Sequence, residues 1–370
     1  MTMTAGRFTG FAVLAGSAAL VLAAWSDGHR PDAIEHVASL REARAVHTAT
    51  TLTSGLVLVA GGMTNGGGSL ASGELYDPTT NRIQTTGQMA EPRSGHSATR
   101  LPDGRVLIAG GFNGEYLRSI EIFDPADNRF HPGGMLGQAR SGHTATLMPD
   151  GRILFIGGVG DGWTFLQSAE VYQPANGRSG LVGPMMVPRE SHTATLLADG
   201  SVLVVGGHNG RRQNMEVFAS AEIFDPGTLR FQPAGRMALP RHKHDAVRFL
   251  DGRVLIIAGA DRTDRTHYPS TEIYDPGLRE FRPGPPMHHP RYKIAGTSIL
   301  LGTGDILVTS GAVAAELLDA SGTAFREVPG RLPSAYRFAT ASATPGGDVV
   351  IIGGYSDDNR NTAGVWRFTR

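Results

Sequence analysis

Short hydrophobic runs recur along the chain at a spacing of about fifty residues, each framed by turn residues. Residues 106–109 read Val-Leu-Ile-Ala and residues 202–205 read Val-Leu-Val-Val, in both cases after an Asp-Gly turn and before a Gly-Gly pair. A four-residue run without polar positions is typical of a strand buried on both faces, and Asp-Gly is a strong signal for a hairpin turn. The pattern therefore predicts many short, tightly connected strands and an all-β protein.

The segments around each run complete a unit of four strands. A Thr-rich strand such as residues 192–197 precedes the Asp-Gly turn, and a Glu-apolar-aromatic strand such as residues 222–224 follows the Gly pair. An Asp-Pro turn, as at Asp225-Pro226, then leads to the fourth strand. The pair of small residues recurs at Gly61-Gly62, Gly110-Gly111, Gly157-Gly158, Gly206-Gly207, Gly259-Ala260, Ser310-Gly311 and Gly353-Gly354.

Seven such units predict a seven-bladed β-propeller. One four-stranded blade cannot bury both of its faces alone, so neighbouring blades pack around a common axis. The last unit shows three strands, at about residues 337–344, 348–353 and 363–369, before the sequence ends. We expect residues 33–38 to supply its fourth strand, so that an N-terminal strand joins the last blade and closes a single domain over residues 33–370.

These motifs resemble the Kelch-repeat family, which includes the propeller domain of galactose oxidases and exported bacterial Kelch proteins. The Gly pair, the Tyr or Phe of the third strand and a repeated Arg-x-x-His carry the resemblance over residues 33–370. It implies a Kelch-type propeller. The Trp that the family places in the fourth strand is Ile or Phe here, and the copper chemistry of galactose oxidases needs a Tyr–Cys crosslink that a chain without Cys cannot form.

The first 26 residues have the pattern of a signal peptide. Arg7 precedes an apolar run over residues 11–24, and the small residues Ala24 and Ser26 offer cleavage points. The run is too short to span a bilayer comfortably. We therefore expect an exported protein, periplasmic or secreted, without a membrane span.

Composition narrows the classes of partner. The 34 basic residues balance 34 acidic ones, and the sequence pI is 7.3, so we expect no nucleic acid partner. The absence of Cys excludes disulfides, thiolate metal sites and Cys nucleophiles. The sequence predicts no cofactor, and a closed ring without a free sheet edge predicts a monomer.

Three polar positions recur in all or most blades, and we interpret them as structural because a repeated position usually defines the repeat itself. Arg and Glu at fixed positions suit bidentate ion pairs between linkers and strands. Blade seven has Gly364 at the expected Glu position, which would leave Arg337 without that partner. The repeated residues are Arg44, Arg93, Arg140, Arg189, Arg241, Arg291 and Arg337; Glu74, Glu121, Glu170, Glu222, Glu272 and Glu316; and His47, His96, His143, His192 and His244.

Residues that break the repeat are the candidates for function. Two positions after each blade Arg, the sequence has Val46, Gly95, Gly142, Ser191, Lys243, Lys293 and Ala339. The two lysines of the chain thus occupy equivalent positions in adjacent blades, at the mouth of the central channel. With Arg337 they predict a cationic pocket over blades five to seven for a carboxylate or a phosphate. The alternative is that the symmetry has decayed and the lysines are solvated.

Further off-pattern residues surround this pocket. The aromatic ones suit stacking on sugar rings, or they simply pack the loops. Beyond Lys243, Lys293 and Arg337, the ligand-binding candidates are His242, Tyr292, His288, His289, Tyr268, Trp163 and Tyr355.

Three functions are compatible with these residues. We favour a propeller that binds a small anionic ligand, a glycan or a protein partner on the face that carries the blade linkers and the loops after the Gly pairs. The second is a cofactor-independent enzyme, such as a sugar epimerase, mutarotase or cyclase-like catalyst, acting at the channel mouth. The third, a metal-dependent oxidase, is less favoured because the histidines lack a tight ligand spacing. The catalytic candidates are Lys243, His244, Asp245, Lys293 and Arg337.

Overall fold

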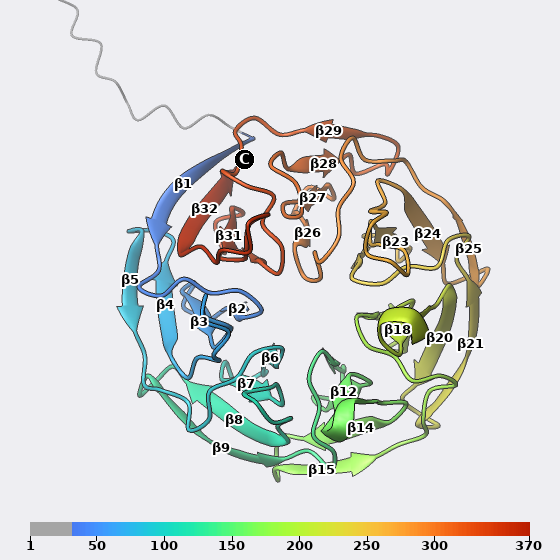
Figure 1. Ribbon diagram of the computed structural model, residues 1–370, viewed down its shortest axis with the longest axis horizontal. Helices are drawn as coiled ribbons and strands as arrows, with labels where there is room; N and C mark the ends of the chain where they lie inside the picture. Colours follow the sequence, from blue (N-terminus) through green and yellow to red (C-terminus); the bar gives the residue numbers. More distant parts are fainter. Residues whose placement is uncertain (1–31) are drawn as a thin grey trace, which may run out of the picture.

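Seven four-stranded sheets form a closed ring in the computed structural model, which describes residues 32–370 (Figure 1). The all-β, seven-bladed propeller predicted from the sequence is confirmed. The expected signal peptide lies outside the described residues. Between residues 32 and 370, no helix reaches the length and hydrophobicity that crossing a bilayer requires.

The strands of the first six blades follow one another in chain order. Blade one has β2 (Thr48–Thr51), β3 (Val57–Ala60), β4 (Gly73–Asp77) and β5 (Arg82–Thr85), and blade two has β6 (Ser97–Arg100), β7 (Val106–Ala109), β8 (Ser119–Asp124) and β9 (Arg129–Met135). Blade three has β10 (Thr144–Leu147), β11 (Ile153–Ile156), β14 (Ala169–Gln173) and β15 (Arg178–Leu181), and blade four has β16 (Thr193–Leu196), β17 (Val202–Val205), β20 (Ser220–Asp225) and β21 (Arg230–Arg236). Blade five has β22 (Asp245–Arg248), β23 (Val254–Ile257), β24 (Thr271–Asp275) and β25 (Glu280–Pro283), and blade six has β26 (Ser298–Leu300), β27 (Ile306–Val308), β28 (Glu316–Leu318) and β29 (Phe325–Glu327).

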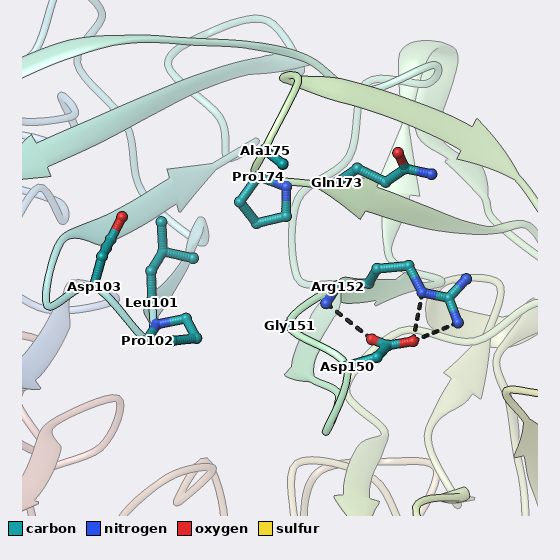
Figure 2. Close-up of a pocket in the computed structure, with 9 residues that line it drawn as sticks. All are labelled: Leu101, Pro102, Asp103, Asp150, Gly151, Arg152, Gln173, Pro174 and Ala175. Atoms are coloured by element: carbon teal, nitrogen blue, oxygen red, sulfur yellow. Dashed lines mark hydrogen bonds and ion pairs between the residues drawn. The ribbon is translucent and has the colours of Figure 1, made fainter.

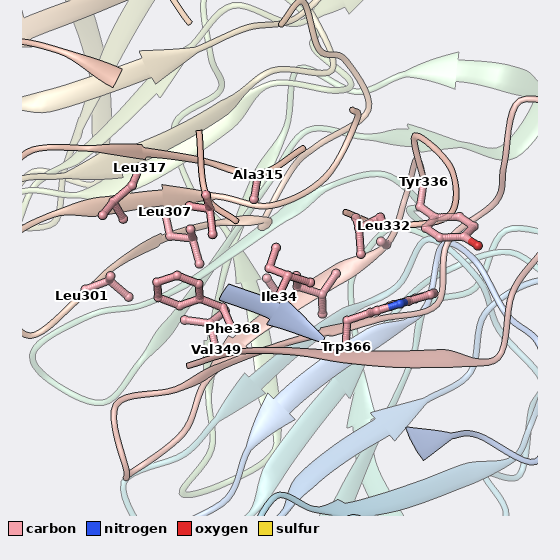
Figure 3. Packing of buried hydrophobic residues seen from close by; sticks show 14 residues of the cluster. Ile34, Leu301, Leu307, Ala315, Leu317, Leu332, Tyr336, Val349, Trp366 and Phe368 are labelled. Atoms are coloured by element: carbon pink, nitrogen blue, oxygen red, sulfur yellow. The ribbon is translucent and has the colours of Figure 1, made fainter. Parts of the chain in front are cut away.

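The seventh blade joins both ends of the described chain. It contains β30 (Thr340–Ala343), β31 (Val349–Ile352), β32 (Gly364–Thr369) and β1 (Ala33–Ser39), and β1 pairs antiparallel with β32. Ile34 of β1 packs against Trp366 and Phe368 in a core shared with blade six (Figure 3). The N-terminal strand is therefore the outer strand of the last blade.

Two loops on the linker face carry small elements of their own. Blade three has β12 (Val159–Gly160) paired with β13 (Thr164–Phe165) around the 3-10 helix η1 (Asp161–Trp163). Blade four has β18 (His208–Asn209) paired with β19 (Glu216–Val217) around η2 (Arg212–Asn214). We call these hairpins and the equivalent loops after the other Gly pairs the rim of the linker face.

Six buried Arg–Glu pairs fasten the linkers to their blades, as the repeat predicts. In blade three, Arg140 Nη2 lies 2.6 Å from Glu170 Oε1, and both side chains are fully buried. The other pairs span 2.7 to 2.9 Å. They are Arg44–Glu74, Arg93–Glu121, Arg189–Glu222, Arg241–Glu272 and Arg291–Glu316.

In blade seven, the residue at the position of the buried Arg comes one residue earlier than the repeat predicts. The Gly311 amide donates to Tyr336 O, as the Gly62 amide donates to Arg93 O, so Tyr336 occupies the place of the buried Arg. Trp366 pairs with Ile351, which is the register of Glu74 with Val59, so Trp366 rather than Gly364 takes the place of the Glu. The rings of Tyr336 and Trp366 lie 5.0 Å apart. An aromatic pair has thus replaced the ion pair, and Arg337 is one position further along.

Five buried histidines bind the neighbouring blade, which supports their structural interpretation. Nε2 of His96 lies 3.0 Å from Thr48 Oγ1, and His47, His143, His192 and His244 make the equivalent contact to a Thr or Ser. Burial lowers the pKa of His96 and of His192 to about 3. These rings are therefore neutral spacers between inner strands.

Candidate functional site

The linkers meet around the channel axis in a ring of backbone hydrogen bonds. The Lys243 amide donates to Ser191 O at 3.0 Å, the Lys293 amide to Lys243 O at 2.8 Å, and the Phe338 amide to Lys293 O at 2.9 Å. The two lysines are therefore equivalent residues of adjacent blades, as predicted, but the blade-seven residue is Phe338 and not Ala339. The cause is the same one-residue shift that moves Arg337.

A cavity of about 280 Å³, the mouth cavity, opens at this ring. Four of its lining residues, Val46, Ser191, Lys243 and Lys293, have φ between 54 and 57°, where Gly95 and Gly142 supply the same conformation in other blades. Left-handed backbone disfavours a side chain, so the lysines stand at positions where glycine would fit with less strain. The charged and polar lining consists of Ser141, Thr144, Glu190, Ser191, Lys243, Lys293 and Thr340, together with the histidine rings of blades one to four.

Lys293 is the cation most available in this cavity. Its Nζ donates to Tyr355 Oη at 2.7 Å, and among residues 32–370 it makes no ion pair with a carboxylate. Three aromatic rings surround it, with Nζ 5.0 Å from the centroid of Tyr292, 5.6 Å from Phe338 and 5.4 Å from Tyr355. Burial raises the pKa of the Tyr355 hydroxyl, which therefore stays protonated and offers its lone pairs to the ammonium.

The other two predicted cations already have carboxylate partners. Lys243 Nζ lies 2.5 Å from Asp264 Oδ2, and Arg337 Nη2 lies 2.5 Å from Asp357 Oδ1. The guanidinium of Arg337 also lies 5.0 Å above the ring of Tyr292. Lys243 and Lys293 therefore both line the mouth cavity, whereas Arg337 lies over Tyr292 and does not line it, and the excess charge is centred on Lys293.

A chain of polar contacts continues from Lys243 into the rim. His242 Nε2 lies 3.0 Å from Asp264 Oδ1, His242 Nδ1 lies 3.2 Å from His208 Nδ1, and His208 Nε2 lies 3.1 Å from Glu190 Oε2. His242 is fully buried and His208 is 4% exposed. Burial lowers the pKa of His242, and contact with the Asp264 carboxylate opposes this. Two cavity residues, Glu190 and Lys243, are thus joined through a buried histidine pair.

Two of the catalytic candidates lie inside the blades. His244 Nε2 contacts Thr193 Oγ1 at 3.1 Å, and the Asp245 carboxylate accepts the amides of Gly296, Thr297 and Ser298 at 2.8 to 3.1 Å. Burial raises the pKa of Asp245, although these amides oppose it. Asp245 holds the start of blade six, where Ile294 replaces the usual histidine. Neither residue lines the mouth cavity.

Three further candidates are also used by the scaffold. His288 Nδ1 contacts Glu316 at 2.9 Å and His289 Nε2 contacts Glu327 at 2.8 Å, both on the linker between blades five and six. Tyr268 lies over the buried guanidinium of Arg241, with its ring centroid 5.5 Å away. None of the three lines the mouth cavity.

Trp163 belongs to a separate pocket on the rim of blades two and three. Its ring lies 5.6 Å from Tyr116 and 6.2 Å from Phe112, and the guanidinium of Arg211 covers it. The Trp163 side chain remains half exposed. It does not share a site with the lysines.

The opposite face carries grooves that repeat with the blades. Figure 2 shows one between blades two and three, where Asp150 pairs with Arg152. An equivalent groove lies between blades four and five, at Asp251 and Arg253. A groove that recurs with the repeat reflects blade packing, so we assign no site to it.

Sequence reasoning missed several residues of the mouth. Glu190 and His208 break the pattern of blade four, and both could have been found by comparing the residue after each blade Arg and after each Gly pair. Asp264 and Asp357 lie in loops of unequal length. The repeat therefore does not predict which residues the side chains of Asp264 and Asp357 contact.

Comparisons with known proteins agree on the fold. Residues 92–134 match the Kelch motif. A solved structure of a fungal alcohol oxidase of the AA5 family, in complex with copper, matches with a TM-score of 0.72 and 17% identity over 91% of this chain and 75% of that chain. No curated protein matches the sequence.

At 17% identity, the similarity to the oxidase structure establishes the fold of this chain and not its reaction or its metal. A metal centre would need a cluster of donor side chains. Residues 32–370 contain no group of three or more His, Cys, Asp or Glu side chains placed to hold a metal ion. His208 and His242 approach each other, but their Nε2 atoms face Glu190 and the carbonyl of Asp261. The described residues do not fit a metal centre of such donors.

Proposed function

Because this chain is a seven-bladed β-propeller of the Kelch type, we propose that it binds a small ligand with a single carboxylate in the mouth cavity, and that Lys293 makes the charged contact. The observation that carries the proposal is the setting of Lys293. Its ammonium lies at a cavity wall among three aromatic rings, and in residues 32–370 no carboxylate pairs with it.

The charges around the cavity favour a monoanion over a phosphate. Lys243 and Arg337 are balanced by Asp264 and Asp357. The side chains of Glu190 and Asp264 are 28% and 34% exposed, so their carboxylates would repel a second negative charge on the ligand. One uncompensated ammonium matches one carboxylate.

The walls favour a ligand with a ring. Phe338 lines the cavity, Tyr292 and Tyr355 lie behind it around the same ammonium, and an acidic sugar offers a carboxylate next to an apolar ring face. A volume of about 280 Å³ lies near the lower end of small-molecule pockets, so a monosaccharide-sized ligand fits better than a polymer.

A thermal-shift measurement tests the proposal. Glucuronate at a hundred times its dissociation constant should add about 2.7 kcal/mol to the stability of the folded protein and raise its melting temperature, whereas neutral glucose should not. The Lys293→Met variant, which keeps much of the side-chain volume, should lose the shift.

Arg360→Ala is the matched control. Arg360 is a cation of the same linker face, 83% exposed, in the loop after the Gly pair of blade seven, and its removal should leave the shift unchanged. Equal shifts in the wild type and in Lys293→Met would contradict the proposal. So would the absence of a shift with glucuronate and with other small carboxylates.

A further inference from the structure

A second cavity on the linker face, the rim pocket, lies between blades two and three. Its volume is about 680 Å³, against about 280 Å³ for the mouth cavity, and the two cavities share no lining residue. Its walls include Phe112 and Tyr116 from the loop after the Gly pair of blade two, and Trp163 from η1. These aromatic residues play no part in the proposed function.

The three rings of the rim pocket hold one another in place. The ring centroid of Phe112 lies 5.0 Å from that of Tyr116 and 6.2 Å from that of Trp163. The rings of Tyr116 and Trp163 lie 5.6 Å apart, with an interplanar angle of 87°. The backbone is fixed as well, because Phe112 and Ser94 exchange two backbone hydrogen bonds, at 2.9 and 3.0 Å. Side chains that are already packed lose little freedom when a ligand binds, so this aromatic surface is preorganised.

Trp163 is an unusual residue for a loop that only packs against its neighbours. Its φ of 63° lies in the left-handed region, where a bulky side chain is disfavoured. The residue is nevertheless 50% exposed, although the guanidinium carbon of Arg211 lies 3.0 Å from the ring centroid. Arg211 is not among the residues that line the rim pocket, so it does not fill the pocket. A strained and half-exposed aromatic residue contributes little to the core, and its position suits contact with a ligand.

Charged side chains of both signs surround the three rings. Glu115 and Asp161 supply carboxylates to the rim pocket and Arg118 supplies a guanidinium, and all three residues are exposed. Within residues 32–370, none of the three forms an ion pair. Arg118 and Arg211 balance the two carboxylates, so the pocket favours neither a cationic nor an anionic ligand. Hydroxyl groups match this lining, because each can donate to a carboxylate or accept from a guanidinium.

We propose that the rim pocket is a second binding site, which takes a neutral β-1,4-linked oligosaccharide and stacks one of its sugar rings on Trp163. The hydroxyls of glucose and xylose units with this linkage are equatorial, so each sugar ring has apolar C–H faces that pack on an aromatic ring. The hydroxyls lie at the edge of the sugar ring, where the charged side chains of the pocket can bind them. A single sugar leaves most of the pocket empty, so glucose should bind too weakly to raise the melting temperature. This second site does not rest on the proposed function.

Tryptophan fluorescence of the full chain tests whether a sugar reaches the ring of Trp163. Cellotetraose or xylotetraose should change the emission with saturation, whereas glucose at the same concentration should not. Trp366 is 3% exposed and belongs to a buried core, and Trp25 lies outside the described residues. The response should therefore disappear in Trp163→Asn, a substitution chosen because Asn tolerates left-handed backbone.

Calorimetric titration with the same tetrasaccharide separates loss of the fluorescent reporter from loss of binding. Trp163→Asn should weaken the affinity at least about tenfold, because an aromatic anchor carries much of the binding energy of such a site. Tyr116→Ala keeps Trp163 as the reporter and should weaken the affinity about three- to tenfold. Leu278→Ala is the matched control and should bind as the wild type does. It removes an apolar side chain, 67% exposed in the turn between β24 and β25, that lines neither cavity.

The two proposals fail in different ways. No response to either tetrasaccharide, or equal affinity in the wild type and in Trp163→Asn, would overturn the rim site and leave the proposed function standing. Loss of tetrasaccharide binding in Lys293→Met would place the sugar in the mouth cavity and would also overturn the rim site. Tetrasaccharide binding that persists in Lys293→Met, without glucuronate binding in the wild type, would support the rim site and reject the proposed function.

Discussion

Individual residues at the mouth depart from the repeat. These departures point to the candidate site, but they do not predict the contacts that its side chains make. The sequence identifies Lys243 and Lys293 because they are the charged residues at a repeat position that has Val, Gly, Ser or Ala in the other blades, and the ring of backbone hydrogen bonds confirms that they are equivalent. Their different states could not be predicted. Asp264 neutralises Lys243 from a loop of blade five whose path carries no repeat signal, whereas aromatic rings surround Lys293.

The repeated buried histidines make the free energy of unfolding depend on pH. The pKa of His96 and of His192 is about 3 in the folded protein and about 6.5 in an unfolded chain. Below about pH 6.5 the unfolded state therefore binds more protons, so the free energy of unfolding decreases as the pH falls toward 3. At pH 5 each of these two histidines should have lost about 2 kcal/mol of its contribution.

Urea unfolding at about pH 7.5 and about pH 5 measures this effect. His96→Gln, which can still contact Thr48, should show a smaller loss than the wild type. Identical unfolding free energies at the two pH values would show that these rings are not kept neutral by burial.

At the scale of the element, each blade depends on a linker fastened by a buried ion pair. The sequence predicted six of these pairs from the repeat alone. The repeat prediction was wrong at blade seven. Arg337 looks like the repeated Arg in the sequence, but it follows the buried position by one residue. Only the backbone bonds show that Tyr336 and Trp366 fill the two buried places.

Removing one member of a pair should be costly. Glu170→Ala leaves Arg140 buried without its carboxylate and also removes the acceptor for the Gly137 and Gln138 amides. We expect a loss of about 3 to 5 kcal/mol in the free energy of unfolding, measured by urea denaturation. Glu327→Ala, whose carboxylate is 42% exposed, should cost no more than about 1 kcal/mol. Similar losses for both variants would mean that the buried pair contributes no more than a surface contact.

At the scale of the whole molecule, the repeat fixes seven blades, and their count determines which residues converge on the axis. The residues that converge on the axis could be predicted because every blade contributes the same linker position to the mouth. The contact between His208 and His242 could not be predicted, because it forms where the rims of blades four and five meet, between residues far apart in sequence. The ring is thus a regular scaffold, and the charged residues that break the repeat at the mouth lie over blades four to seven.

Calorimetric titration of glucuronate into the wild type and into Lys293→Met tests the central claim most directly. We predict one binding site per chain in the wild type, no measurable heat of binding in Lys293→Met, and unchanged binding in Arg360→Ala. Binding of equal strength in Lys293→Met, or more than one equivalent site per ring, would contradict the assignment of the ligand site to the mouth cavity.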